Sequence, residues 1–407
     1  MLDLQARELD AWHMRRAGKE VLSLALMDAR NQLLRWVGAC EEALGGPSMT
    51  VPRLAEINPP LWEIGHVGWF QETWIGRNLQ RQRGVACDPT HARLASILPH
   101  ADRWYDSSHV AHATRWDLDL PDLETTRQYL VDTLEATLDL LHGSREDEGS
   151  LYFYRLALLH EEMHIEALAI LSQTLGFDAG LLPRLASQAP RAPLLFPATR
   201  WTLGREAEGF VFDNERGSLE VAVPEFEIDA QPVSWAQYGE FVEDGGYDEA
   251  RHWSADGWAW VEREGRRTPR HVEQMRQGVL QRRFGRTQRV PLGQPAVHLT
   301  WYEADAWCRW AGRRLPGEVE WEVAAHQGAS RGFRWGEVWE WTATTFAPYP
   351  GFVVHPYRDY SQPWFQTHKV LKGASFATRP GLRSATYRNF YLPERDDIFA
   401  GFRSCAV

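Results

Sequence analysis

Residues 151–176 read LYFYRLALLHEEMHIEALAILSQTLG, a pattern that predicts a helix over 151–175 ended by Gly176. Within this stretch His160 and His164 stand four residues apart. On a helix that spacing projects both imidazole rings from one face, about one turn apart. The pair could therefore bind one metal ion, although the same spacing also occurs in histidine pairs of a helix surface or core.

Three more helices are predicted before this one. They cover 17–44, a segment that opens with Asn58 as its N-cap, and 123–142. Four amphipathic helices predict a bundle. His66 lies in the middle of the second helix between large apolar residues, where a solvated histidine is not expected.

His66, His160 and His164 together predict a metal site with three imidazole ligands. Such a site keeps open coordination positions for a substrate or O2, whereas a structural site is closed by a fourth protein ligand. Three neutral ligands also leave a divalent ion with its full charge, which favours an anionic co-ligand such as a thiolate or selenolate. Residues 160–164 also match the HExxH pattern of zinc proteases, but that pattern recurs by chance in helices.

The second half of the chain has a different character. Helical periodicity stops after the predicted bundle at 1–185, and a linker is predicted at 186–199. From 200 to 407 short alternating stretches are separated by Gly, Pro and Asp turns, with helices predicted only at 234–243 and 300–312. A chain of 407 residues is long enough for two domains, so we expect two separate cores.

The composition narrows the range of partners. A formal net charge of −11, with no run of Lys or Arg longer than a pair, argues against a nucleic-acid or membrane partner. The chain has neither a basic and apolar leader nor a window of about 18 apolar residues, so we expect a soluble cytoplasmic protein. The four cysteines never stand in CxxC spacing, so any metal should take nitrogen or oxygen ligands.

Several motifs resemble those of one family of two-domain enzymes. WEIGHVGWFQE at 62–72 and HEEMHIEAL at 160–168 resemble the DinB-like bundle of the ergothioneine-type sulfoxide synthases. The second half is similar to the lectin-like domain of the formylglycine-generating-enzyme type. The motifs that carry this second similarity are RLPGEVEWEVAA at 314–325, VWEWTATTF at 338–346, VLKGASFAT at 370–378 and GFR at 401–403. The resemblance implies an α+β fold.

The resemblance also implies an Fe(II) enzyme in which the three histidines hold the iron. Its reaction partners would be hercynine (the N-trimethylated betaine of histidine), a sulfur or selenium donor, and O2. In the family the trimethylammonium group is held just after an Arg-Asn step, here Arg388 and Asn389, so the resemblance assigns Asn389 and Phe390 to hercynine. An aromatic face beside a quaternary ammonium is a cation–π site.

The chain departs from the family pattern in three places. The usual Asn-Trp-Asp ends in Tyr391, and the residue before the last ligand, commonly Gln, is Met163. The two arginines that grip the carboxylates of gamma-glutamylcysteine fall on His112 and Arg115. Losing part of that clamp would cost a charged peptide substrate about 1.5–3 kcal/mol per charge-assisted bond.

A neutral selenium donor would need hydroxyl and imidazole partners instead, which Tyr391, His112, Ser107 and Ser108 could offer. The pattern therefore most resembles the branch of the family that couples hercynine with a selenosugar in selenoneine biosynthesis. The alternative within the family is a sulfoxide synthase that uses gamma-glutamylcysteine or cysteine. The family also uses a tyrosine as a proton donor, for which Tyr349 is a candidate, although Phe352 three residues later could occupy that position instead.

Three alternatives belong to other classes. A zinc-dependent DinB-like thiol S-transferase could use the same three histidines, but it has no evident need of the second domain. A lectin-like binding protein would leave the inward-facing imidazoles unexplained. Oxidation of a protein cysteine of the formylglycine type depends on a cysteine pair, and RSATYRNF at 383–390 contains no cysteine.

Overall fold

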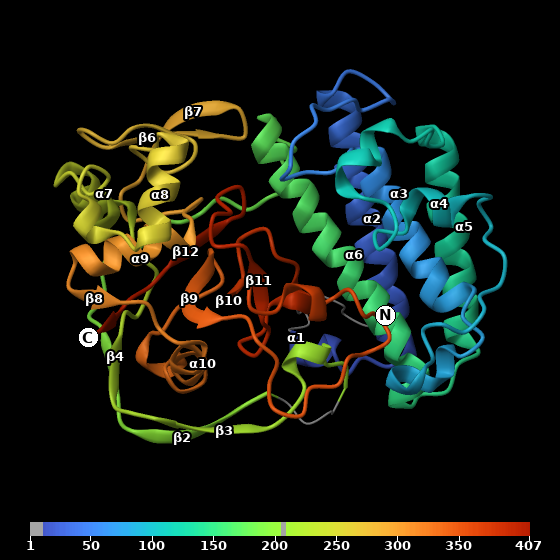
Figure 1. Ribbon diagram of the computed structural model, residues 1–407. Coiled ribbons are helices and arrows are strands. Elements are labelled where there is room, and N and C mark those ends of the chain that lie inside the picture. The colour runs from blue at the N-terminus through green and yellow to red at the C-terminus, as the bar shows by residue number, and fades with distance from the viewer. Residues whose placement is uncertain (1–10, 205–208) are drawn as a thin grey trace, which may run out of the picture.

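The computed structural model describes residues 11–204 and 209–407, and the first part of the chain is helical (Figure 1). Its α-helices are α1 (Ala11–Met14), α2 (Lys19–Ala43), α3 (Pro60–Gln71), α4 (Ala101–Tyr105), α5 (Leu123–His142) and α6 (Glu148–Leu175). The long helices α2, α3, α5 and α6 confirm the predicted bundle. Helix α6 begins three residues earlier than predicted, because the Asp147 side chain accepts a hydrogen bond from the Ser150 backbone N–H and caps it.

The predicted N-cap of the second helix is wrong. Pro59 is the N-cap residue of α3, and Pro60 takes the first helical position, where a missing N–H does no harm. The Asn58 side chain is therefore free for tertiary contacts. It donates to Glu63 Oε2 at 2.6 Å and accepts from Arg115 Nη1 at 2.6 Å.

The second part of the chain mixes short strands and helices. Its strands are β1 (Leu194–Phe196), β2 (Thr199–Leu203), β3 (Leu219–Val223), β4 (Phe226–Ile228), β5 (Val272–Gln274), β6 (Val279–Arg283), β7 (Arg286–Val290), β8 (Arg313–Arg314), β9 (Trp339–Thr345), β10 (Lys369–Gly373), β11 (Asn389–Tyr391), β12 (Ala400–Phe402) and β13 (Cys405–Ala406). Its helices are α7 (Trp235–Glu243), α8 (Ala255–Glu264), α9 (Trp301–Trp310) and α10 (Glu318–Gln327). The α+β class is confirmed. The expectation of only two helices here is wrong, since α8 and α10 also form.

The strands make four small sheets, in the orders β1-β4-β13-β8, β11-β10-β9-β12, β2-β3 and β5-β6-β7. Strand β1 pairs antiparallel with β4 and lies inside the segment predicted as a linker, 186–199. In the second sheet β11 pairs with β10, with Tyr391 opposite Lys369, while β12 runs parallel to β9. Because side chains alternate along a strand, Asn389 and Tyr391 share one face of β11 and Phe390 lies on the other.

The expectation of two separate cores is wrong. One cluster of buried apolar residues extends from Leu26 on α2 to Phe402 on β12, with a smaller cluster around α10. Helix α6 lies between the bundle and the sheets (Figure 1), so it is buried on nearly all sides. Glu166 on α6 accepts hydrogen bonds from Trp339 Nε1 and from the hydroxyls of Ser375 and Thr378, which ties the two parts together.

Among the described residues, no helix is both long and apolar enough to cross a membrane.

Candidate metal centre

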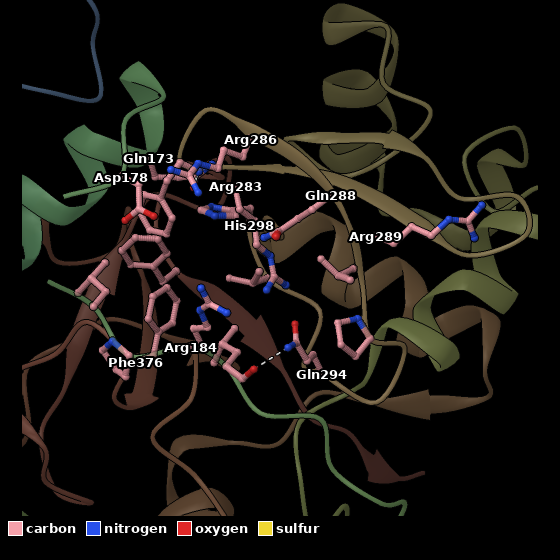
Figure 2. Close-up of a pocket in the computed structure, with 18 of the residues that line it drawn as sticks. Gln173, Asp178, Arg184, Arg283, Arg286, Gln288, Arg289, Gln294, His298 and Phe376 are labelled. Carbon is pink, nitrogen blue, oxygen red and sulfur yellow. Dashed lines mark hydrogen bonds between the residues drawn. The ribbon is translucent and has the colours of Figure 1, made fainter. Parts of the chain in front are cut away.

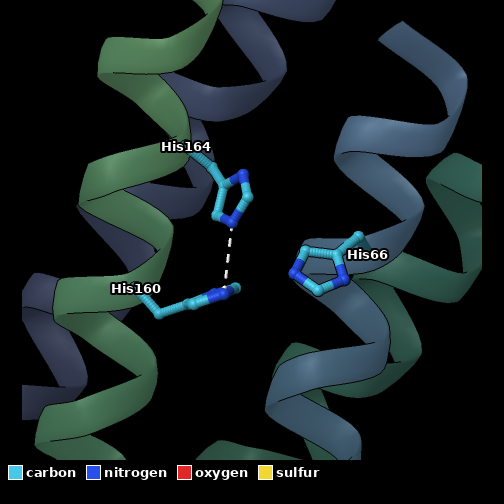
Figure 3. Close-up of side chains that lie close together, drawn as sticks. All are labelled: His66, His160 and His164. Atoms are coloured by element: carbon cyan, nitrogen blue, oxygen red, sulfur yellow. Dashed lines mark hydrogen bonds between the residues drawn. The ribbon is translucent and has the colours of Figure 1, made fainter. Parts of the chain in front are cut away.

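The three predicted histidines meet between α3 and α6 (Figure 3). His66 comes from α3, and its ring centroid lies 5.1 Å from that of His160 and 5.0 Å from that of His164. One ring nitrogen from each histidine lies within 4.8 Å of the other two. His160 Nε2 and His164 Nε2 are only 3.1 Å apart. Helix spacing predicted the pair on α6, and the packing of α3 against α6 adds the third ring.

Hydrogen bonds outside the cluster define which nitrogens are free. His66 Nδ1 lies 2.7 Å from the backbone oxygen of Tyr105, which can only accept, so Nδ1 carries the proton and Nε2 keeps its lone pair. His164 Nδ1 lies 2.6 Å from Glu63 Oε1, and the carboxylate orients this ring in the same way. An outer hydrogen bond of this kind is typical of metal-ligating histidines.

The donor set fits a divalent transition metal. The bare Nε2 lone pair of His164 points at His160 Nε2, an arrangement that a cation between them would stabilise. Metal–nitrogen bonds of about 2.0–2.1 Å place two ligands about 2.8–3.4 Å apart for bond angles between octahedral and tetrahedral. The 3.1 Å separation lies inside that range. Within residues 11–204 and 209–407 these histidines are the one group of three or more His, Cys, Asp or Glu side chains placed closely enough to hold a metal ion. The group includes no carboxylate.

Burial keeps the imidazoles of His66 and His160 neutral. It lowers the pKa of His66 to about 3, with the neighbouring His164 adding to the effect. Burial and the other two rings hold the pKa of His160 well below its ordinary value. Burial alone would raise the pKa of Glu63, but the charge and hydrogen bond of His164 outweigh it and the net pKa is lowered. Neutral imidazoles at His66 and His160 are the state that metal binding requires.

Aromatic rings enclose the cluster. Phe70 stacks on His160 with centroids 3.5 Å apart, and Trp62 stacks on His66 at 4.9 Å. Tyr357, from the second part of the chain, packs against both Phe70 and His160. These contacts fix the ring planes and keep bulk water away from one side of the site.

A cavity of about 440 Å³ opens on the outer side of Phe70 and Tyr357, and none of the three histidines is among the residues that line it. Trp69, Phe70 and Tyr357 form its inner wall. Polar and charged residues line the rest, among them Asp102, Asp106, Ser107, Ser108, His109, Asp359, Arg77, Arg93 and Arg358. Three carboxylates and three guanidinium groups leave the lining close to electrically balanced.

The predicted hercynine residues lie on β11 and just before it. Phe390 stacks on Phe346, with centroids 4.1 Å apart, and turns away from Asn389 and Tyr391. Tyr391 lies under the Arg395 guanidinium, and burial raises its pKa. Arg388 is buried and makes a bidentate ion pair with Glu318, so we expect it to position β11 rather than to contact a substrate.

The other predicted residues surround the bundle side of the site. Arg115 lies over the Trp62 ring, 3.7 Å from its centroid, and bonds Asn58. His112 Nε2 is 2.8 Å from the backbone oxygen of Ile57, and neither His112 nor Arg115 lines the cavity of about 440 Å³. Met163 is half-buried on α6, next to His164. Their roles in substrate binding remain predictions.

Sequence reasoning missed two residues of the site. The first is Tyr357, whose ring packs against His160. The predicted Tyr349 instead packs under Arg388, whose guanidinium carbon lies 4.1 Å from the centre of the tyrosine ring. No local pattern in the loop around Tyr357 indicates this position. Glu63, the partner of His164, stands three residues before His66 on α3, and that spacing on a ligand-bearing helix was an available signal.

Known proteins resemble this chain over most of its length. The hercynine oxygenase of Mycolicibacterium smegmatis is 31% identical over 401 residues, covering 85% of this chain and 90% of that protein. The hercynine oxygenase of Mycobacterium tuberculosis is 31% identical over 400 residues, with the same coverage. Residues 181–337 match the family described as a sulfatase-modifying factor enzyme 1-like domain. The formylglycine-generating enzyme of Bos taurus is 30% identical over 173 residues, covering 39% of this chain and 46% of that enzyme.

Proposed function

The chain belongs to the hercynine oxygenase family, and from this membership we propose that it is an O2-dependent non-haem Fe(II) enzyme that joins hercynine to a selenosugar. The reaction would be that of a selenoneine synthase, forming a carbon–selenium bond on the imidazole ring. Coupling an imidazole C–H with a selenol Se–H releases two protons and two electrons. O2 takes these and two more electrons from selenium, which leaves one water and a selenoxide.

Iron bound at His66, His160 and His164 would supply the activation of O2 that an unreactive aromatic C–H requires. The chain's own groups hold the ligands and exclude water. Glu63 and the Tyr105 carbonyl orient two of the imidazoles, and Phe70 fixes the third by stacking. Holding both substrates at one centre converts a three-component encounter into a positioned one.

The cavity on the outer side of Phe70 and Tyr357 is the observation that carries the choice of a neutral selenium donor. Asp106, Ser107 and Ser108 line it and can bond to sugar hydroxyls as acceptors or donors. Its three carboxylates offset its three guanidinium groups, so the lining has no net positive charge to attract an anionic peptide, and burial together with Asp106 raises the pKa of Asp359. This supports a sugar over gamma-glutamylcysteine.

One observation favours a sulfur alternative in the same cavity. Arg93 Nη1 is buried without a hydrogen-bond partner, and Arg358 also lines the wall, so a carboxylate of gamma-glutamylcysteine or cysteine could be bound there. Formylglycine-type chemistry is less well supported. The four cysteines are free and buried, and burial raises the pKa of the Cys308 and Cys405 thiols above the usual range.

The test is a turnover assay with competing donors. Anaerobically purified protein is loaded with Fe(II) and given hercynine, O2 and either a selenosugar, the matching thiosugar or gamma-glutamylcysteine, with products identified by mass spectrometry. His160→Ala removes a ligand. His142→Ala is the matched control, because His142 is an exposed histidine at the end of α5.

A hercynine–selenium adduct that forms preferentially from the selenosugar and is lost only in His160→Ala is the expected result. Preferential turnover of gamma-glutamylcysteine would contradict the selenosugar as the donor and support the sulfur alternative. Absence of any adduct, together with zinc retained through purification, would overturn the oxygenase proposal in favour of a zinc thiol transferase.

A further inference from the structure

A second cavity, of about 530 Å³, lies away from the histidines (Figure 2). It is bounded by the C-terminal end of α6, the segment 178–185 and the hairpin of β6 and β7. Gln173 on α6 lines it and stands nine residues after His164, which is about 13 Å along the helix. The cavity is therefore separate from the candidate metal centre and needs its own explanation.

The walls of this cavity are held together by specific contacts. Gln173 Oε1 accepts from the Phe284 backbone N–H at 2.8 Å, and its Nε2 donates to the Arg282 carbonyl at 3.1 Å. Gly285, with φ +78°, packs so closely on Gly176 that a Cβ on Gly285 would lie 2.0 Å from the Gly176 oxygen. The hairpin is thus clamped to the end of α6, and the cavity is a built feature of the fold.

The lining is strongly cationic. Arg184, Arg283 and Arg286 contribute three guanidinium groups, against the single carboxylate of Asp178, while Arg289 also lines the cavity but donates its Nη1 to the Gln277 carbonyl at 2.9 Å. In the described part of the chain none of these four arginines has a carboxylate within 4.0 Å, whereas several arginines elsewhere in the same half make ion pairs. Like charges gathered in one hollow destabilise a protein unless an anion binds between them.

Three buried polar atoms in the same lining lack a partner. They are Arg283 Nη2, His298 Nδ1 and Gln294 Oε1. His298 and Gln294 are 3% and 6% exposed, and the Gln294 amide is held in place through its other end, which donates to the Leu185 carbonyl at 2.5 Å. Figure 2 shows these side chains around one hollow. Buried polar atoms without partners are costly, so they point to a ligand that carries both acceptors and donors.

One wall of the cavity is aromatic. Phe399 packs on Phe376, with centroids 4.6 Å apart, and also contacts Phe284 and the His298 ring. Such a wall suits a flat or apolar part of a ligand, and guanidinium groups opposite it suit phosphate oxygens. A volume of about 530 Å³ is within the range of small-molecule sites.

We propose that this cavity binds an organic phosphate of nucleotide size, with the phosphate on Arg184 and Arg283 and the remainder against Phe376 and Phe399. Water could satisfy the three unpaired atoms but would not neutralise the guanidinium groups. The site does not depend on the chemistry proposed for the histidines.

Binding is measured by isothermal titration calorimetry on the full chain, using adenosine diphosphate, ribose 5-phosphate, inorganic phosphate and ribose as probes. The variants are Arg283→Gln and, in case that half-buried position disturbs folding, Arg184→Gln at the exposed rim. Arg282→Gln is the matched control, since Arg282 is exposed and points to the other face of β6.

We expect adenosine diphosphate to bind, ribose not to bind, and each cavity variant to weaken binding about tenfold to a hundredfold. Arg282→Gln should bind as the wild type does. Tighter binding of ribose 5-phosphate than of adenosine diphosphate would support the phosphate site and contradict the proposed contact of the ligand with Phe376 and Phe399. Failure of both organic phosphates to bind, or equal weakening in the control, would overturn the proposal.

Discussion

Replacing Glu63 by glutamine removes one charge from the metal centre while keeping the size of the side chain. In the structure Arg115 donates to Asn58, Asn58 donates to Glu63, and His164 Nδ1 donates to the other Glu63 oxygen, at 2.6 Å. A carboxylate can accept both bonds. The single oxygen of an amide can replace only one of these two acceptors. In the Glu63→Gln variant the N–H donor of either Asn58 or His164 would therefore face the amide N–H of Gln.

The expected loss can be worked from these bonds. Exchanging a charge-assisted bond to His164 for a neutral one costs about 1–1.5 kcal/mol, and the mismatch at Asn58 adds roughly 1 kcal/mol or more. A total of about 2–3 kcal/mol corresponds to roughly 30- to 150-fold in an equilibrium constant. Part of that loss is shared by the metal-free protein, so we expect Fe(II) to bind about tenfold more weakly.

Metal affinity is measured by anaerobic titration of the protein against a chelator of known affinity, with thermal unfolding as a check that the variant folds. Glu135→Gln, at an exposed position on α5, is the matched control and should leave the affinity unchanged. An affinity in Glu63→Gln equal to that of the control would refute the assignment of Glu63 as the group that orients His164.

Three further predictions concern other parts of the molecule. Burial raises the pKa of Glu303 from 4.5 to about 7, so the folded protein holds a proton that the unfolded chain releases. The contribution of Glu303 to stability is therefore greatest below pH 4.5 and falls by roughly 3 kcal/mol as the pH rises through 7. The Tm of Glu303→Gln relative to wild type should increase between pH 5 and 8. Gly285→Ala should lower the free energy of unfolding, measured in urea, by about 2 kcal/mol or more, because the new Cβ meets the Gly176 backbone. The control is Gly312→Ala, at φ +65° with no atom within 4 Å of the new Cβ, which should show only the smaller cost of the backbone angle. Ser107→Ala should raise the KM for the selenosugar roughly 2- to 10-fold and leave that for hercynine unchanged in steady-state assays, while an equal rise for both substrates would remove Ser107 from the selenosugar site.

Much of the helical half could be predicted because its determinants are local. Periodic apolar residues and the glycines that end them predicted α5 with its observed bounds and α6 to within three residues. The spacing of His160 and His164 likewise placed two rings on one face of a helix. The ends of helices were less certain, since Asn58 makes tertiary bonds instead of capping α3.

The second half was harder to predict because its short elements depend on their neighbours. Helix α8 is capped by the Ser254 hydroxyl, which accepts from the Gly257 backbone N–H, and this N-cap signal was not used in the prediction. Strand β1 forms only because β4 lies beside it. The expected division into two cores failed because α6 is buried from both sides, and a pattern in one segment does not report what packs against its second face.

The sequence alone predicted the bundle and placed His160 and His164 on one helix face, since these follow from helix period, and the apolar surroundings of His66 together with the family resemblance added it to the candidate site. The spacing of the cysteines predicted nitrogen or oxygen ligands. Only the tertiary structure showed that Glu63 orients His164, that Tyr357 rather than Tyr349 contacts His160, and that Arg184, Arg283 and Arg286 line a second cavity. The physical reason is range. Periodicity acts over a few residues along the chain, whereas these contacts join α3 to α6, or α6 to distant loops, and depend on how whole elements pack.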